Sequence, residues 1–252
     1  MKGIVFYNAR IIDPSVGLDV YGSLITKENK ILSIENKIKP EFSEENFDSH
    51  DCKKNVLSPG IIDMSVSIGE PGYEHKENIV SATKSAVAGG VTTIISMPDT
   101  NPVIDDVPLL DFLLGRAKNF GLINVLPMAS LTKNLEGKKM SEIGLLKKSG
   151  AIAFTDGYRS IANTNLMRNL FLYTSDFDAL ICHYLDVAEL SESGSMNEGE
   201  ISTRLGLKGI PKVSESIMLN RDIQLLESLK VGKYHALCIS TSESMEIIKE
   251  AK

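Results

Sequence analysis

The segment Ser58-Pro-Gly-Ile-Ile-Asp-Met-Ser-Val-Ser-Ile-Gly-Glu-Pro-Gly-Tyr-Glu-His-Lys-Glu77 organises the rest of the chain. Its apolar run passes into an alternation of apolar and polar residues and stops at a turn rich in Gly and Pro, which predicts a buried strand with an alternating tail. Ser65 and Ser67 of this strand face the same way, because side chains on a strand repeat every two residues. A metalloenzyme would place a pair of ligands at two such positions, and here both are serines.

Strand-like and helix-like runs alternate after this point. We expect strands at 56–68, 91–98, 123–130, 151–156, 179–186 and 233–241, and helices at 77–88, 107–120, 141–148, 163–173, 213–229 and 243–252. These runs make six strand–helix units whose strands are rich in Val and Ile. Such an alternation predicts an α/β fold with a parallel sheet, either open and doubly wound or closed as a barrel.

Polar residues at the ends of the expected strands favour the barrel. They are Ser65, Ser67, Asp99, Asp156, His183 and Cys238. Five strands that contribute to one mouth are typical of a TIM-type (β/α) barrel, whereas an open sheet concentrates its site at one switch point. Six units leave the barrel incomplete, so we expect exposed sheet edges that aggregate, pair with another chain or belong to a longer protein.

The amino-terminal part of the chain reads differently. Short strands are expected at 3–12 and 23–35, with a hairpin turn at Glu28-Asn29, followed by a polar connector over 40–55. We therefore expect two domains, an amino-terminal β subdomain of sandwich type at 1–55 and a barrel domain at 56–252.

The composition narrows the class of protein. The chain has 252 residues, 42% of them hydrophobic and 24% charged, with a formal net charge of −6. The acidic balance and the lack of a Lys/Arg-rich run disfavour nucleic-acid binding. No apolar run is long enough for a membrane span or a cleavable leader, so we expect a cytoplasmic protein. The three cysteines are an odd number spread far apart, which favours reduced thiols over a disulfide framework.

Four motifs together resemble one enzyme family. They are Glu70-Pro-Gly-Tyr-Glu-His-Lys-Glu77, Gly89-Gly-Val-Thr-Thr93, Met97-Pro-Asp-Thr-Asn-Pro102, and the loop that runs from Met196-Asn-Glu-Gly-Glu200 to Gly209-Ile-Pro211. The set is similar to the motifs of type I dihydroorotases, zinc amidohydrolases of pyrimidine biosynthesis. The last loop is the most diagnostic, because the hydantoinases and allantoinases that share the barrel usually lack it. The resemblance implies an amidohydrolase barrel.

The resemblance also implies where a metal site would lie. In dihydroorotases a zinc site activates a bridging hydroxide, and its first ligands are two histidines on the first barrel strand. Ser65 and Ser67 stand at those positions. Asp156 and His183 stand at later ligand positions, and Cys238 stands where the family has another histidine.

The substrate pocket departs from the family pattern as well. The arginine that grips the substrate carboxylate in the family corresponds to Gly69, and the neighbouring asparagine corresponds to Asp99 in the motif that also holds Asn101. A carboxylate at Asp99 would repel the carboxylate of such a substrate. The family's catalytic aspartate belongs to a later strand, which these 252 residues do not contain.

The same residues also have purely structural interpretations. Ser65 and Ser67 are expected as hydroxyls bonded to water or backbone, since serine is a poor zinc ligand, and Cys238 as a small buried apolar side chain. Asp156 and His183 either hydrogen-bond to one another in a polar cavity or hold a weak metal together with Cys238.

These departures predict a dihydroorotase-like pseudoenzyme without a cofactor. Inactive members of the family serve as structural partners of aspartate carbamoyltransferase, so the resemblance implies an oligomer with that enzyme or with another dihydroorotase chain. Two alternatives stay open. One is an active zinc-dependent cyclic amidohydrolase with an altered metal site, and the other is a fragment of a longer dihydroorotase-like chain.

Overall fold

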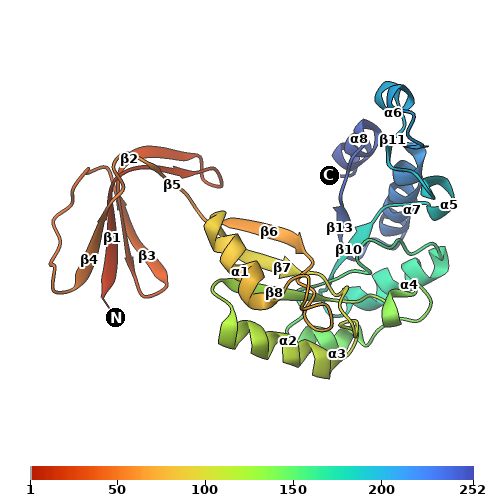
Figure 1. Ribbon diagram of the computed structural model, residues 1–252, viewed down its shortest axis with the longest axis horizontal. Coiled ribbons are helices and arrows are strands. Elements are labelled where there is room, and N and C mark those ends of the chain that lie inside the picture. The colour runs from red at the N-terminus through yellow and green to blue at the C-terminus, as the bar shows by residue number, and fades with distance from the viewer. Residues whose placement is uncertain (1) are drawn as a thin grey trace. The chain divides into compact units, whose positions relative to one another are not determined.

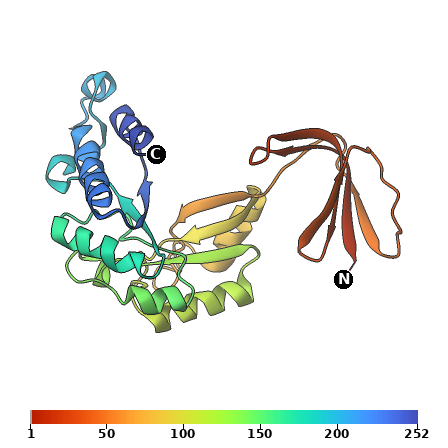
Figure 2. The same ribbon diagram turned by 180° about the vertical axis from the view of Figure 1, so that it is seen from behind.

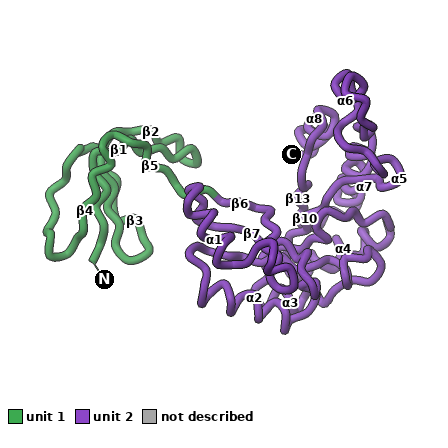
Figure 3. Tube along the Cα trace, in the orientation of Figure 1, with its two compact units in different colours: residues 1–61 green, residues 62–252 purple. Residues whose placement is uncertain are grey.

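A computed structural model describes residues 2–252 and divides the chain into two compact units (Figure 3). The first unit ends at Ile61 and the second runs from Ile62 to Lys252. The expected boundary lay at residue 55. The structure moves it because β5 (Val56–Leu57) pairs with β1 (Gly3–Asp13), so the expected strand 56–68 is divided between two sheets.

The first unit is a five-stranded sheet in the order β3-β2-β1-β4, with β5 also pairing with β1. Its other strands are β2 (Leu18–Lys27), β3 (Lys30–Glu35) and β4 (Phe47–Asp51). The hairpin turn at Glu28-Asn29 is confirmed, since Lys27 pairs with Lys30. The second layer that a sandwich would need stays a prediction.

The expected connector over 40–55 is wrong in part, because β4 lies within it. This strand pairs in parallel with β1, from Gly3 opposite Phe47 to Tyr7 opposite Asp51. Most of its side chains are polar and exposed. The strand is therefore held by backbone hydrogen bonds and carries no apolar periodicity that a sequence could reveal.

The second unit contains a curled sheet of six strands in the order β13-β10-β9-β8-β7-β6 (Figures 1 and 2). The strands are β6 (Ile61–Val66), β7 (Val91–Ser96), β8 (Asn124–Ala129), β9 (Ala153–Phe154), β10 (Leu180–Tyr184) and β13 (Lys233–Leu237). The pairings from β7 to β8, β9, β10 and β13 are all parallel. The six strands of the sequence prediction are thus confirmed as one parallel sheet.

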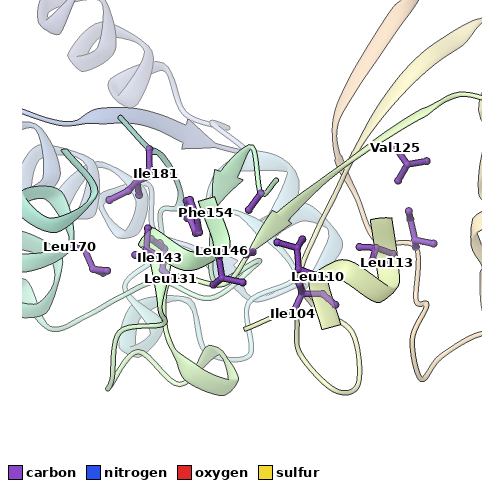
Figure 4. Packing of buried hydrophobic residues seen from close by; sticks show 14 of the residues in the cluster. Ile104, Leu110, Leu113, Val125, Leu131, Ile143, Leu146, Phe154, Leu170 and Ile181 are labelled. Atoms are coloured by element: carbon purple, nitrogen blue, oxygen red, sulfur yellow. The ribbon is translucent and has the colours of Figure 1, made fainter. Parts of the chain in front are cut away.

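Helices cover one face of this sheet. They are α1 (Ile79–Ala88), α2 (Val107–Phe120), α3 (Ile143–Lys148), α4 (Thr164–Ser175), α7 (Val213–Leu229) and α8 (Ser242–Ala251), with a short 3-10 turn at Lys133–Leu135. Leu110 and Leu146 from the helices pack with Phe154 and Ile181 from the strands in the main core (Figure 4). Each expected helix is present within a few residues of its predicted ends.

One excursion was not expected as secondary structure. Between β10 and α7 the chain forms α5 (Ala188–Ser191), β11 (Met196–Asn197), α6 (Glu200–Leu205) and β12 (Gly209–Ile210), and the two strands pair with each other. These elements are too short to show a period in the sequence. They contain the Met-Asn-Glu-Gly-Glu loop.

The turn after β6 is built around a buried carboxylate. Glu70 accepts the backbone N–H of Ile79 at 2.9 Å, which caps the first turn of α1, and Arg116 of α2 donates to it at 2.5 Å. Only 2% of Glu70 is exposed. The Glu-Pro-Gly motif therefore has a structural role, since it joins the start of one helix to the middle of the next.

The strand β6 is less buried than the sequence predicts. Ile61 and Ile62 are each 59% exposed, and Met64 is 40% exposed. Both β6 and β13 have a single neighbour in the sheet. The exposed edges expected for a six-unit sheet are present. Separately, no helix within residues 2–252 combines the length and the apolar character of a membrane span.

Candidate functional site

The two faces of the curled sheet have different contents. The helix-covered face contributes to the main core, whereas the inner face carries a small cluster made only of strand residues and the residues next to them. The buried members of that cluster are Ile95, Met97, Met128, Ala153, Cys182 and Leu237. In parallel α/β proteins, polar groups that act on a ligand lie where this inner face reaches the carboxyl ends of the strands.

Ser65 and Ser67 lie at the carboxyl end of β6, on the face opposite Val66 and Ile68, which pack against the main core. Ser67 donates a hydrogen bond to Asp99 Oδ2, with 2.6 Å between the oxygens. Ser65 Oγ is buried and has no partner in the protein. The sequence predicts that both hydroxyls bond to backbone or water. It does not predict the side-chain hydrogen bond from Ser67 to Asp99, which connects β6 to the loop after β7.

Gly69 and Asn101 flank this corner. Gly69 has φ of 78°, and a Cβ there would meet the carbonyl oxygens of Glu77 and Tyr73 at 3.1 Å. The backbone N–H of Asn101 donates to the Pro71 carbonyl at 3.0 Å, which ties the two loops together. A side chain at position 69 requires a left-handed backbone and a small shift of its neighbours, so the local fold favours glycine.

Asp156 is buried just after β9. It accepts hydrogen bonds from the backbone N–H and the hydroxyl of Thr132, the first at 2.9 Å. Burial raises the pKa of this carboxyl above its ordinary value, against the opposing effect of the Thr132 donors. Both carboxylate oxygens therefore serve to fix the loop that follows β8.

His183 lies on the helix-covered face, two residues after Ile181 of the main core. Its Nε2 accepts the backbone N–H of Ile161 at 2.9 Å, and its Nδ1 lies 2.6 Å from Asp222 Oδ2. Because an amide N–H can only donate, Nε2 is the acceptor and the ring proton sits on Nδ1. Both nitrogens are engaged, so the expected hydrogen bond between His183 and Asp156 is wrong.

The partner Asp222 completes a buried network. Its Oδ2 also accepts from the Tyr234 hydroxyl at 2.9 Å, and its Oδ1 accepts from Arg221 at 2.6 and 2.9 Å. Burial acts to raise the pKa of Asp222, but His183 and Arg221 outweigh it and hold the pKa below the ordinary value. Arg221 also donates to the Ile161 carbonyl at 2.7 Å. The network thus forms hydrogen bonds with both the N–H and the carbonyl oxygen of Ile161.

Cys238 follows β13 in a left-handed backbone conformation with φ of 56°. Its side chain is exposed, so the expectation of a buried apolar cysteine is wrong. The strand ends at Leu237, and the left-handed residue turns the chain outward at the next position. Partial burial and the nearby Glu215 carboxylate raise the pKa of the Cys238 thiol.

Glu215 of α7 organises the loop after Cys238. Its carboxylate accepts from the backbone N–H and the hydroxyl of both Ser240 and Thr241, at 2.7 to 3.1 Å. Burial acts to raise the pKa of Glu215, but the surrounding hydroxyl and backbone donors lower it below the ordinary value overall. This carboxylate holds the start of α8 in place.

Two tyrosines that the sequence did not single out lie at the carboxyl end of β10 and in the loop after β9. Tyr184 ends β10 on the same face as Cys182, and its ring packs edge-on against Tyr158, with 5.8 Å between the centroids. Tyr158 is 54% exposed. Side chains on a strand alternate between its two faces, so Tyr184 faces inward with the buried Cys182, whereas His183 faces the helices.

A comparison by sequence agrees with the fold. Residues 54–244 match the profile of the family described as dihydro-orotase-like. The chain belongs to the dihydroorotase-like family. A dihydroorotase from Ehrlichia canis (strain Jake) is 41% identical over 250 residues, and one from Wolbachia sp. subsp. Drosophila simulans (strain wRi) is 44% identical over 250 residues.

Both alignments cover 99% of this chain and 56% of the relative, so the chain spans little more than half the length of these dihydroorotases. Solved structures agree on the fold. The L-hydantoinase (dihydropyrimidinase) from Arthrobacter aurescens superimposes with a TM-score of 0.79 at 17% identity, over 100% of this chain and 56% of that one. A D-hydantoinase gives 0.75 at 20% identity, over 99% and 55%.

The residues at the strand ends do not fit the zinc centre that the dihydroorotase-like family implies. Serine hydroxyls stand where imidazoles would be needed, and His183 has no free ring nitrogen. Within residues 2–252 no three His, Cys, Asp or Glu side chains are grouped so that they could hold a metal. Asp156, His183 and Cys238 are therefore not brought together as one ligand set.

The sequence prediction missed two structurally important acids, although a signal for them exists. The buried residues of α7 are Ser214, Glu215, Met218, Leu219 and Asp222. They follow the helical period, so both acids fall on the apolar stripe of an expected helix. A charged residue on such a stripe indicates a buried partner, which is what Glu215 and Asp222 have.

Proposed function

We propose that this chain is a non-hydrolytic member of the dihydroorotase-like family and acts as a structural subunit in pyrimidine biosynthesis. The observation that carries the proposal is the position of His183, which faces the helices and uses both ring nitrogens within the protein. Zinc hydrolases need at least three nitrogen, oxygen or sulfur ligands around one open position. The corresponding strand ends offer serine hydroxyls, the Asp99 carboxylate, tyrosine phenols and the exposed Cys238 thiol.

The corner near Asp99 supports the same proposal. A substrate that carries a carboxylate would need a cation at this place. The position that could supply one is occupied by Gly69, in a backbone conformation that favours glycine. The carboxylate of Asp99 repels an anionic group that approaches Ser67. We therefore expect the chain neither to bind the usual family substrate nor to hydrolyse it.

Metal content and turnover test the proposal directly. Purified chain, expressed with zinc in the medium, should contain far less than one zinc per molecule and should neither open dihydroorotate nor close carbamoyl aspartate. A full-length dihydroorotase handled in parallel should retain zinc and activity. About one zinc per chain with measurable turnover would overturn the proposal in favour of an amidohydrolase with an altered metal site.

The partner that we propose is aspartate carbamoyltransferase in the cytoplasm. The support for it is the family membership. Analytical ultracentrifugation of the two purified proteins should show a complex with a fixed stoichiometry. Independent sedimentation of both proteins at micromolar concentration would remove this part of the proposal and leave the enzymatic part intact.

A further inference from the structure

The loop from Thr132 to Met140, between β8 and α3, closes on itself. Thr132 and Met140 form an isolated antiparallel bridge, and the Lys133 N–H donates to the Lys139 carbonyl at 2.8 Å. The Gly137 N–H donates back to the Thr132 hydroxyl oxygen at 2.9 Å. We call this loop the strap, because its two ends are joined while its tip contacts loops from two neighbouring strands.

The tip of the strap has a strained backbone. Asn134 and Leu135 are consecutive residues with φ of 55° and 57°, in the left-handed region that glycine alone adopts without a steric cost. Asparagine tolerates this region better than most side chains, whereas leucine does not. Two such residues in a row persist only where surrounding contacts hold them, so the closed strap depends on the groups that bind its tip.

Two residues from outside the strap hold this tip. Asp105, in the loop after β7, accepts the Asn134 N–H at 2.9 Å, and its backbone carbonyl accepts from the Lys133 side chain at 2.6 Å. Arg159, in the loop after β9, donates to the Leu135 carbonyl at 3.2 Å. Each of the two strained residues therefore has a backbone group bound by a neighbouring loop.

The base of the strap holds the carboxylate of Asp156. Thr132 donates its N–H and its hydroxyl to the two oxygens of this carboxylate, the first at 2.9 Å. Both residues are buried. Because the Gly137 N–H binds the same hydroxyl oxygen, opening of the tip removes a contact that orients Thr132 toward Asp156.

We propose that the strap is a conformational latch that opens locally while the sheet stays folded, and that Arg159 and Asp105 hold it shut over Asp156. In the closed state these two residues stabilise the strained tip. In the open state Asn134 and Leu135 return to ordinary backbone conformations, and the Asp156 carboxylate becomes accessible to solvent. The strap therefore controls access to a buried carboxylate at the end of β9.

Hydrogen exchange followed by mass spectrometry tests the latch on the full chain. Wild-type amides at 133–137 should exchange at least about tenfold faster than the amides of β8, which open only with the sheet. Arg159→Met removes the donor and keeps an unbranched side chain, and it should speed exchange at 133–137 about fivefold through the loss of one hydrogen bond. Arg168→Met is the matched control, because Arg168 is exposed on α4, and it should leave that exchange unchanged.

A second pair of variants tests the other side of the latch. Asp105→Ala removes the acceptor of the Asn134 N–H and the partner of Lys133, so it should speed exchange at 133–137 about tenfold. Asp105→Asn keeps an oxygen acceptor and should change that exchange by about twofold or less. Circular dichroism and a melting curve show that each variant is folded.

Chemical labelling reports on the carboxylate that the strap covers. Modification of Asp156 by a carbodiimide and glycine ethyl ester should speed up about fivefold in Arg159→Met, in parallel with the exchange at 133–137. Wild-type exchange at 133–137 as slow as that of β8, or exchange that Arg159→Met leaves unchanged, would overturn the latch. Labelling of Asp156 that stays constant while the strap exchanges faster would overturn its role as a cover.

Discussion

Two polar clusters on opposite faces of the parallel sheet differ in their hydrogen bonding. On the helix-covered face, His183, Asp222, Arg221 and Tyr234 satisfy one another and hold the backbone of Ile161. On the inner face, by contrast, hydroxyl and carboxylate oxygens of the Asp99 corner are buried without partners in the protein. A satisfied network stabilises a fold, whereas buried polar groups without partners cost stability. The difference assigns a structural role to the network of His183 and Asp222.

The strongest test of this comparison is Asp222→Ala. The substitution leaves Arg221, His183 and the Tyr234 hydroxyl without their common acceptor in a buried place, and it should lower the free energy of unfolding by about 3 to 5 kcal/mol. Urea denaturation of both proteins measures the effect. Tyr234→Phe, which removes a single donor, serves as the control and should cost about 1 kcal/mol. Equal losses in the two variants would contradict a shared network.

Glu215→Gln should have the next largest effect. The amide cannot accept four hydrogen bonds with a full charge, so a loss of about 1.5 to 3 kcal/mol is expected at neutral pH. The folded-state pKa of Glu215 lies below its ordinary value of 4.5. Its contribution is therefore complete above pH 4.5 and is lost as the pH falls through the folded-state pKa.

The measurement is urea denaturation of wild type and Glu215→Gln between neutral and acidic pH. The stability difference between the two proteins should shrink below pH 4.5. Lys212 and Glu243 form an exposed ion pair near the same helices, so Glu243→Gln reports the background effect of one lost surface carboxylate. A difference that is constant with pH would assign the effect of Glu215 to packing alone.

Cys238 sharpens the comparison at the mouth of the sheet. Its left-handed backbone disfavours β-branched residues, so Cys238→Val should be about 1 to 2 kcal/mol less stable than Cys238→Gly. Thermal denaturation of the pair gives this difference. If valine and glycine prove equal in stability, the backbone at this position is not left-handed in solution.

Ser65→Ala should have the smallest effect. The hydroxyl is buried without a partner in the protein, so its removal should change the free energy of unfolding by less than about 0.5 kcal/mol, or increase it slightly. Ser67→Ala breaks the bond to Asp99 and should cost about 1 kcal/mol. A large loss in Ser65→Ala would place this hydroxyl in the structural network of the protein instead.

The order of elements was predictable from the sequence because it depends on periodic patterns. The six parallel strands lie within the predicted apolar runs, and α2 and α7 match their expected bounds. The strand β4 was not predicted because most of its side chains are polar. The boundary after Ile61 was not predicted because it depends on the pairing of β5 with β1, two segments that are distant in the chain.

The candidate site was harder to predict for a geometric reason. A single step along β10 moves a side chain from the helices to the inner face, so the choice between His183 and Tyr184 depends on the register of the strand. The family resemblance identified the end of β10 as part of the site, but it did not show which of the two residues faces inward. Asp99 and its serine partner were found correctly as unusual residues, whereas their hydrogen bond required three-dimensional coordinates.

The Glu70–Arg116 pair also bears on the order in which the protein forms during synthesis. Its two members are separated by 46 residues, and Glu70 is the carboxylate that caps the first turn of α1. When α1 leaves the ribosome, Arg116 is still inside the exit tunnel, so the Glu70 carboxylate is an unpaired charge that stays in water. The first two strand–helix units therefore consolidate as one step, when α2 delivers its arginine.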